Sequence, residues 1–309
     1  MAFAQGSQSR LSYVEETTFG TTPATAFTTL PFSTHSLNLT KDLVAGTDIQ
    51  PDRMPRVERH GNPQTSGDIV ADLRKGDYDS FLASAMLSDW QDSGSNDYLK
   101  VGTTPKFFSI EDYAGDITQA RLFVGMTVST MGISIAPNQM ITTTFGMVGQ
   151  NMDFATPESP DDPSTNAPFD AYSGDLQIGN NVAGLASSAI ITGIDFNISN
   201  SFSPTFVIGE VGAPSIEAGR AEVTGTISAY FENQNLINRF IDETETAIEV
   251  SVNDPTESNA YTFLFPRVKI NSADVGVDGP DSRIISLSFT SLYDSTEETN
   301  LKITRTDTA

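Results

Sequence analysis

Apolar and polar residues alternate through most of this 309-residue chain. In residues 283–290, Ile285, Leu287 and Phe289 are each followed by serine or threonine, and residues 194–199 and 248–252 repeat the pattern. Because successive side chains of a strand point to opposite faces, this period predicts strands with one buried face. Clusters of Asn, Asp, Gly, Pro and Ser separate the runs and predict turns. We therefore expect a mainly β chain.

Helical periodicity is scarce and occurs at two places, residues 77–87 and 235–241. In each, apolar residues recur three or four positions apart behind a polar residue that can cap a helix. Both segments are short, so each predicts one helix that flanks a sheet.

The two helical segments belong to an internal repeat. Residues 61–73 match residues 219–231 at an offset of 158, which superimposes two glycines and the alternation that follows them. Further along, an offset of 142 superimposes Thr143, Phe145 and Met147 on Ile285, Leu287 and Phe289. The difference between the two offsets corresponds to an extra loop in the first copy, which we place within residues 89–105. Such co-registration favours a tandem duplication over chance similarity of amphipathic strands.

The repeat divides the chain into segments. Residues 156–168 hold four prolines and several acids, a composition that favours a stiff linker and excludes a central strand. We expect one β-domain at residues 31–155 and a second at residues 169–309. Residues 1–30 are rich in Thr and Ser and predict an N-terminal arm. The polar C-terminus is a second, weaker candidate for an arm.

Charge excludes several classes of function. The chain has 40 acidic and 17 basic residues, a net charge of −23, and 38% hydrophobic residues. A sequence-reading DNA-binding protein needs Lys and Arg to neutralise phosphates, and a protein that coats an anionic membrane needs the same. The 19 phenylalanines argue against a disordered acidic chain. The N-terminus lacks the basic and apolar regions of a signal peptide, and no run approaches the ~20 apolar residues of a membrane span.

No catalytic or metal-binding constellation is recognisable. The absence of cysteine excludes thiolate metal sites and cysteine nucleophiles, and His35 and His60 have no histidine partner at metal-ligand spacing. Asp274, Asp278 and Asp281 are spaced irregularly for Ca²⁺ and fit a turn between strands better. We therefore predict a protein that is not an enzyme and holds neither metal nor cofactor.

An ordered series of segments resembles the opening of the tail tube (major tail) proteins of long-tailed bacteriophages. The series comprises residues 9–23, 37–42, 49–53, 60–62, 66–69 and 78–87. It covers about the first hundred residues, and the second half joins through the internal repeat. The resemblance implies a major tail protein of long non-contractile tails, in a tandem-duplicated form.

This resemblance implies a fold and an assembly. Each copy would be a β-sandwich or barrel with one helix, and copies would join edge to edge in rings that stack into a hollow tube. Six such folds make a ring in this family, so a duplicated chain would form a trimer with pseudo-sixfold symmetry. Unpaired sheet edges are satisfied by neighbours when a ring closes. In this family, N-terminal arms of this kind link stacked rings, so the resemblance implies the same role for residues 1–30.

The resemblance also implies partners and a location. Beyond further copies of itself, the protein would meet tail terminator, tape-measure and tail-tip proteins in a virion assembled in the host bacterial cytoplasm. Double-stranded DNA would pass through the lumen without specific binding, and the tube protein would bind no membrane. An acidic wall repels phosphate, although the same charge also serves solubility.

Charge is divided unevenly between the halves. Residues 1–155 carry a net charge of −7 and residues 156–309 a net charge of −16. The candidates for contacts between subunits or stacked rings are the basic Arg53, Arg56, Arg59 and His60 before Gly61 and the acidic Glu210 and Glu217 before Gly219. We expect complementary surfaces there, the alternative being loops with solvated charges.

Two other classes remain open. A tail-tip, baseplate or adhesin-like binding module could be built of the same sandwiches. A carbohydrate-active enzyme would need an acid pair in an aromatic cleft, and the single Trp90 makes a poor sugar platform.

Overall fold

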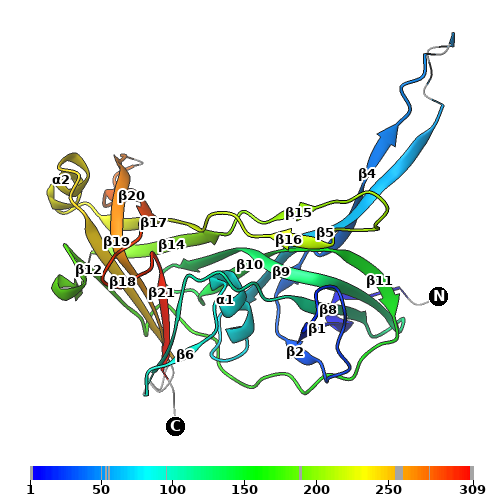
Figure 1. The fold of residues 1–309 in the computed structure, drawn as a ribbon. Coiled ribbons are helices and arrows are strands. Elements are labelled where there is room, and N and C mark those ends of the chain that lie inside the picture. The colour runs from blue at the N-terminus through cyan, green and yellow to red at the C-terminus, as the bar shows by residue number, and fades with distance from the viewer. Residues whose placement is uncertain are drawn as a thin grey trace.

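The computed structural model describes residues 3–49, 51–52, 54, 56–94, 96–187, 190–254, 260–277 and 279–306, and it consists mainly of antiparallel strands with two α-helices (Figure 1). The predicted β class is confirmed. The first half contains β1 (Ser9–Glu15), β2 (Thr28–Leu30), β3 (Thr34–His35), β4 (Asn38–Ala45), β5 (Glu58–Asp72), α1 (Asp79–Met86), β6 (Gln91–Asp92), β7 (Asn96–Lys100), β8 (Phe108–Ala114), β9 (Gln119–Ile135), β10 (Thr142–Gly149) and β11 (Asn151–Ala155). The second half contains β12 (Asp175–Gly179), β13 (Ala186–Ser187), β14 (Ile191–Ser199), β15 (Ser203–Thr205), β16 (Ser215–Glu217), β17 (Glu222–Tyr230), α2 (Asn235–Ile241), β18 (Thr246–Asn253), β19 (Ala260–Val275), β20 (Ile284–Ser291) and β21 (Lys302–Thr306).

In the first half, β5 pairs with β3 and β4 on one side and with β10 on the other, and β10 pairs with β9. The 17-residue β9 also enters a second layer, where its first part pairs with β8 and β11, and β8 pairs with β1. Phe108, Phe123 and Phe145 are fully buried in the core of this half. The buried phenylalanines explain why alternation dominates its sequence.

The second half has the same kind of arrangement. Strand β17 lies between β14 and β20, and β20 pairs with β19. The first part of β19 pairs with β18 and β21, and β18 continues to β12. Phe265 packs edge-on against Phe289, with ring centroids 5.6 Å apart.

The two halves share one sheet. Strand β14 of the second half pairs with β9 of the first, from Ile194 opposite Ile135 to Ser199 opposite Thr130. The spatial order across the described residues is therefore β4, β5, β10, β9, β14, β17, β20 and β19. At another place, β21 pairs with β7, so the C-terminal strand also joins the halves.

Helix α1 covers the apolar face of the first half. Its Phe81, Leu82 and Met86 are fully buried, and Phe81 stacks on Phe108 with centroids 4.9 Å apart. Burial of each such side chain stabilises the fold by about 1.5–3 kcal/mol. Leu87 takes a left-handed conformation, φ 49°, and ends the helix. The helix predicted at residues 77–87 is confirmed apart from its ends.

Helix α2 lies where residues 235–241 predict it, but it buries no residue of its own. Within the described residues, no helix combines the length and apolar character needed to cross a membrane.

The expectation that residues 1–30 form an arm is not met at residues 9–15, which belong to the sheet. These residues form β1, whose Leu11 is fully buried and whose Tyr13 packs edge-on against Phe81 at 4.9 Å. The Thr- and Ser-rich flanks hide a short strand with enough apolar surface to enter the core. The described end of the C-terminus is likewise not an arm, because Leu301 and Ile303 are buried and β21 pairs with β7 and β19.

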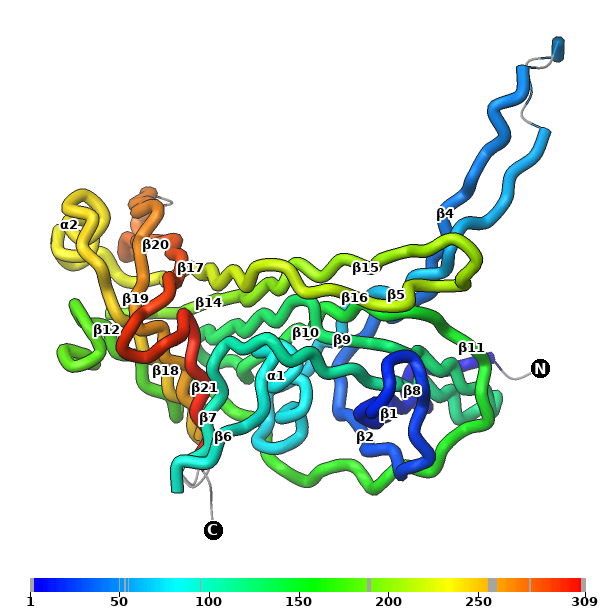
Figure 2. The backbone as a smooth tube through the Cα atoms, in the orientation of Figure 1, coloured from blue at the N-terminus to red at the C-terminus, as the bar shows by residue number. Residues whose placement is uncertain are grey.

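The remaining segments connect these layers. The extra loop at residues 89–105 contains the hairpin of β6 and β7. Residues 156–167 contain neither helix nor strand and run along the first half, where the backbone N–H of Asp161 donates to the carbonyl of Phe27 at 3.2 Å. Figure 2 shows the hairpin of β4 and β5 projecting from the body, while β15 and β16 lie along it.

Candidate functional site

The shared sheet has a polar face opposite its buried side. Alternation puts Ile69, Phe145 and Ile227 on the buried side, and their neighbours point the other way. These outward residues are mostly small and hydroxylated. A shallow hollow in this face is lined by Thr142, Thr144, Asp195, Asn197, Thr224, Thr226 and Ser288, together with neighbouring residues.

The charge of this face is negative. Asp68, Asp195, Glu222 and Asp274 are exposed, and no ion pair involves any of them within the described residues. Two cations of β19 are held in ion pairs, Arg267 by Glu245 and Lys269 by Glu243 at 2.8 Å. Small hydroxyls and unpaired carboxylates offer little to a phosphate backbone, which binds to Lys and Arg.

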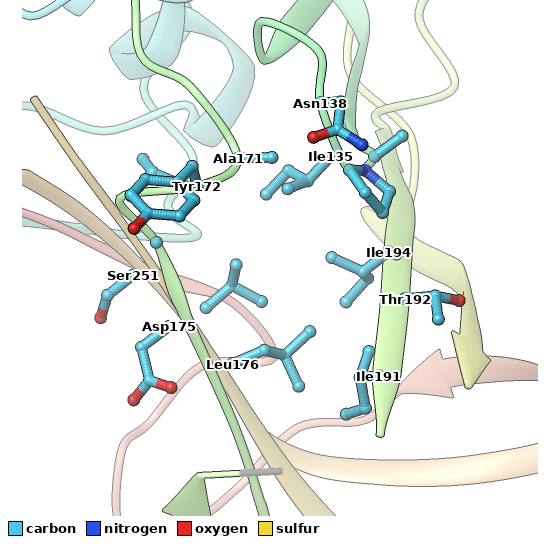
Figure 3. Close-up of a pocket in the computed structure, with 16 residues that line it drawn as sticks. Ile135, Asn138, Ala171, Tyr172, Asp175, Leu176, Ile191, Thr192, Ile194 and Ser251 are labelled. Atoms are coloured by element: carbon cyan, nitrogen blue, oxygen red, sulfur yellow. The ribbon is translucent and has the colours of Figure 1, made fainter. Parts of the chain in front are cut away.

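A second hollow lies at the junction of the two halves. Figure 3 shows its aliphatic walls, which include Ile135 of β9, Leu176 of β12 and Ile194 of β14. Asp175 is the charged side chain among its described lining residues, and it accepts a hydrogen bond from Ser187 Oγ at 2.8 Å. An acid–base pair is therefore missing from the described lining. The described residues also contain no cluster of three or more potential metal ligands.

Those predicted contact residues that the structure describes lie on two hairpins. Arg53 falls outside the described residues. Arg56 forms an ion pair with Asp52 near the tip of the β4–β5 hairpin, and Arg59 and His60 are exposed on β5.

Glu210 and Glu217 are exposed on the β15–β16 hairpin. Among the described residues, no hydrogen bond or ion pair joins these acids to Arg56, Arg59 or His60. The chain alone thus presents the two sets on separate hairpins without joining them.

Sequence reasoning missed the polar cluster that locks the two halves together. Arg305 of β21 forms ion pairs with Asp79 of α1 and Asp97 of β7, and its guanidinium lies 4.4 Å from the ring centroid of Trp90. Tyr261 of β19 donates a hydrogen bond to the same Asp79. Burial, and then the nearby charge of Asp79, raises the pKa of Tyr261 well above its usual value, so the hydroxyl stays a donor. Trp90 is therefore a structural residue at this seam.

A second cluster holds the edge of the first half. Asp112 of β8 lies 3.5 Å from His35 Nε2 and forms an ion pair with Arg121. Burial alone would raise the pKa of Asp112, but the bonds to His35 and Arg121 outweigh it and lower the pKa below its usual value. The cluster fixes β3 against the second layer.

The model of the family described as phage tail tube protein matches residues 6–291 of the chain. The match spans both halves and all the strands of the shared sheet. The chain belongs to the phage tail tube protein family. A search of curated proteins found no match.

Membership agrees with the structural observations. A tail tube protein is a structural component of the virion tail that assembles with copies of itself and with other tail proteins. The family is a structural one. The resemblance seen in the first hundred residues is confirmed.

Proposed function

We propose that three copies of this tail tube protein close into a ring with pseudo-sixfold symmetry, that the rings stack into a hollow tube, and that the phage genome passes through it. The observation that carries this proposal is a repeated register. Phe145 of β10 lies opposite Ile69 of β5, and Leu287 of β20 lies opposite Ile227 of β17. All eight residue pairs of the first ladder correspond to pairs of the second at the two sequence offsets, 142 and 158.

A shared irregularity supports the same reading. The β9–β10 ladder shifts between Gly146 and Met147, which leaves Ser129 as an extra residue. The β19–β20 ladder shifts at the corresponding place and leaves Asn271, which lies 142 positions after Ser129. A bulge is a specific feature rather than a general property of strands, so its recurrence supports two copies of one module, in residues 31–155 and 169–309.

The dimensions of such a ring fit a DNA conduit. Three chains with eight strands each give 24 strands, which at about 4.8 Å spacing make a wall of about 18 Å radius. Strand tilt of about 35–45° widens this to about 22–26 Å, which leaves room for a duplex. We place the polar face toward the lumen because its exposed carboxylates would repel phosphate.

The lining then suits passage without binding. Asp68, Asp195, Glu222 and Asp274 would face the DNA among serine and threonine side chains. Phosphates would approach such a wall against electrostatic repulsion, and the two cations of β19, Arg267 and Lys269, are already held in ion pairs. This explains the acidic balance of the chain as a functional property in addition to solubility.

The two hairpins would provide contacts between neighbouring subunits or stacked rings. Arg56, Arg59 and His60 lie on one exposed hairpin and Glu210 and Glu217 on another, where opposite charges can set register. The proposed basic set also includes Arg53, which is outside the described residues. The ends of the tube would meet tail terminator and tail-tip proteins, and the lumen would hold a tape-measure protein before DNA ejection. We assign the tube to a non-contractile siphovirus tail assembled in the bacterial cytoplasm.

Electron microscopy of the purified protein tests this proposal. We expect hollow filaments whose averaged cross-section contains three chains and six similar lobes. Discrete rings that never stack would instead indicate a tail-tip role, and a monomer at high concentration would refute the proposal.

A further inference from the structure

Within one chain, the two halves are joined where the edge strand of each half, β9 and β14, pairs with the other; we call this contact the seam. Strand β14 pairs with β9 through six residue pairs, with Phe196 opposite Ile133 on the apolar side. At the end of β14, the backbone N–H of Asn200 donates to the carbonyl of Ser129 at 2.9 Å. The side-chain amide of Asn200, which is 1% exposed, donates to the carbonyl of Ala85 at the end of α1 at 2.8 Å.

Each edge of this seam has a counterpart elsewhere in the chain. Strand β14 pairs with β17 as β3 and β4 pair with β5: Ile194 lies opposite Ile227, and His35 lies opposite Ile69. The counterpart of β14 is therefore the segment 34–40, at an offset of 159. The counterpart of the β9 edge, residues 130–135, is the segment 272–277 at the end of β19.

Both counterparts lack a strand on their outer side. Among the described residues, β3 and β4 pair with β5 only, and β19 beyond Ile270 pairs with β20 only. Val277 is 70% exposed, whereas its counterpart Ile135 lies half-buried in the seam. Unpaired edges of this kind are templates for another strand. An antiparallel ring needs one edge of each type per chain, and the chain has both.

We propose that the internal seam is repeated between chains: the segment 272–277 of one copy pairs antiparallel with the segment 34–40 of the next copy. The internal register then fixes the external one. His35 lies opposite Val277, Leu37 opposite Val275 and Leu39 opposite Ala273, all on the apolar side. Ser36 lies opposite Gly276, Asn38 opposite Asp274 and Thr40 opposite Ser272, all on the polar side. The inference rests on the proposed ring and names its contact.

The chemistry of the two edges supports this match. On the covered face Leu37 meets Val275 and Leu39 meets Ala273, and on the other face Asn38 can donate its amide hydrogens to the Asp274 carboxylate. The counterpart of Asn200 is Lys41, which is exposed. In the ring it reaches the C-terminal end of α2, where Asp242 and Glu243 follow. A cation is favourable both at a helix C-terminus and beside carboxylates.

Disulfide trapping tests the register, because the chain has no cysteine. One sample carries Asn38→Cys and a second carries Asp274→Cys, and the two are mixed, assembled and oxidised. We expect a covalent dimer on a non-reducing denaturing gel. The double variant N38C/D274C should give closed trimers. A register-shifted mixture of Asn38→Cys with Ser272→Cys should link about tenfold less, since disulfides need Cβ atoms roughly 3.5–4.5 Å apart.

The outcomes separate this inference from the proposed function. Tubes that form normally but link equally in both mixtures, or in neither, overturn the register and leave the tube intact. Wild-type protein that never assembles refutes the ring as well. Both positions are exposed, and circular dichroism of each single variant checks its fold. If the double variant fails to fold, the mixture of single variants carries the test.

Discussion

Arg305 in the last strand forms an ion pair with Asp79 at the first residue of α1, 226 positions earlier in the chain. The same guanidinium pairs with Asp97 and lies over Trp90. All three partners belong to the first half, so one side chain of the second half closes the seam where β21 meets β7.

Arg305→Ala should therefore destabilise the unassembled chain strongly. The change leaves two mostly buried carboxylates without a cation, and uncompensated charges of this kind cost about 3–5 kcal/mol when fully buried. We expect about 2–4 kcal/mol from urea unfolding at pH 7. Arg267→Ala is the matched control, because Arg267 pairs with Glu245 on the surface and should cost at most about 1 kcal/mol. Equal losses of unfolding free energy in the two variants would show that Arg305 does not stabilise the contact between the halves.

This cluster marks the limit of what the sequence predicts. Local alternation identifies the strands because the side-chain period is a property of a few consecutive residues. Arg305 has no local signature, since its partners are set by which sheet edges meet. The same limit applies to β1, a short strand whose buried Leu11 and Tyr13 are separated by Ser12 and flanked by Thr- and Ser-rich segments. The polar face could be predicted from the sequence, because Ile285, Leu287 and Phe289 are each followed by serine or threonine, but its direction toward a lumen depends on the ring.

The paired glycines of the repeat were visible in the sequence, and the structure supplies their reason. A Cβ on Gly225 would lie 2.6 Å from the carbonyl oxygen of Asp195 and 2.5 Å from the ring of Phe289. A Cβ on its counterpart, Gly67, would lie 2.5 Å from the carbonyl oxygen of Ser36. In both halves, a neighbouring strand approaches too closely for any side chain.

Gly225→Ala should accordingly destabilise the fold by about 1–3 kcal/mol, because the core must shift to admit one methyl group. Thermal unfolding followed by circular dichroism measures the change. Gly6→Ala provides the comparison, since a Cβ there meets nothing within 4 Å. A melting temperature equal to that of Gly6→Ala would contradict the close approach.

Asp112 should make stability depend on pH. Its folded-state pKa is lowered, so the carboxylate contributes stability above its unfolded pKa, near 3.8, and loses it as pH falls through the folded value. Asp112→Asn should be less stable than wild type at pH 7, and the difference should shrink as pH falls below about 3.8. Urea unfolding at low protein concentration measures it, since the sequence pI is about 4.2. A difference that stays constant from pH 7 to pH 3 would remove Asp112 from this role.

Charge on the polar face should control whether tubes retain DNA. Asp195→Lys with Thr226→Lys should assemble into tubes that co-sediment with a short fluorescent duplex added during assembly, and wild-type tubes should not. Retention should fall steeply between about 50 and 200 mM salt, because phosphate binding releases counterions. Asp162→Lys in the linker changes charge on the covered side and should retain no duplex. Retention by that control would mean that net charge, not the polar face, decides binding.

If the basic and acidic hairpins meet in the tube, reversing the charges of both should restore the assembly that reversing one of them impairs. Arg56→Glu with Arg59→Glu should shorten or abolish tubes in negative-stain images, because the acidic hairpin with Glu210 and Glu217 then faces like charges. Arg56→Lys with Arg59→Lys preserves charge and should assemble normally. Glu210→Arg with Glu217→Arg, added to the charge-reversed chain, should restore tube length if the two hairpins meet, since opposite charges again face each other. Normal tubes from the reversed chain would show that these arginines are only solvated. Short tubes that the second reversal leaves unchanged would place the partner of the basic hairpin elsewhere.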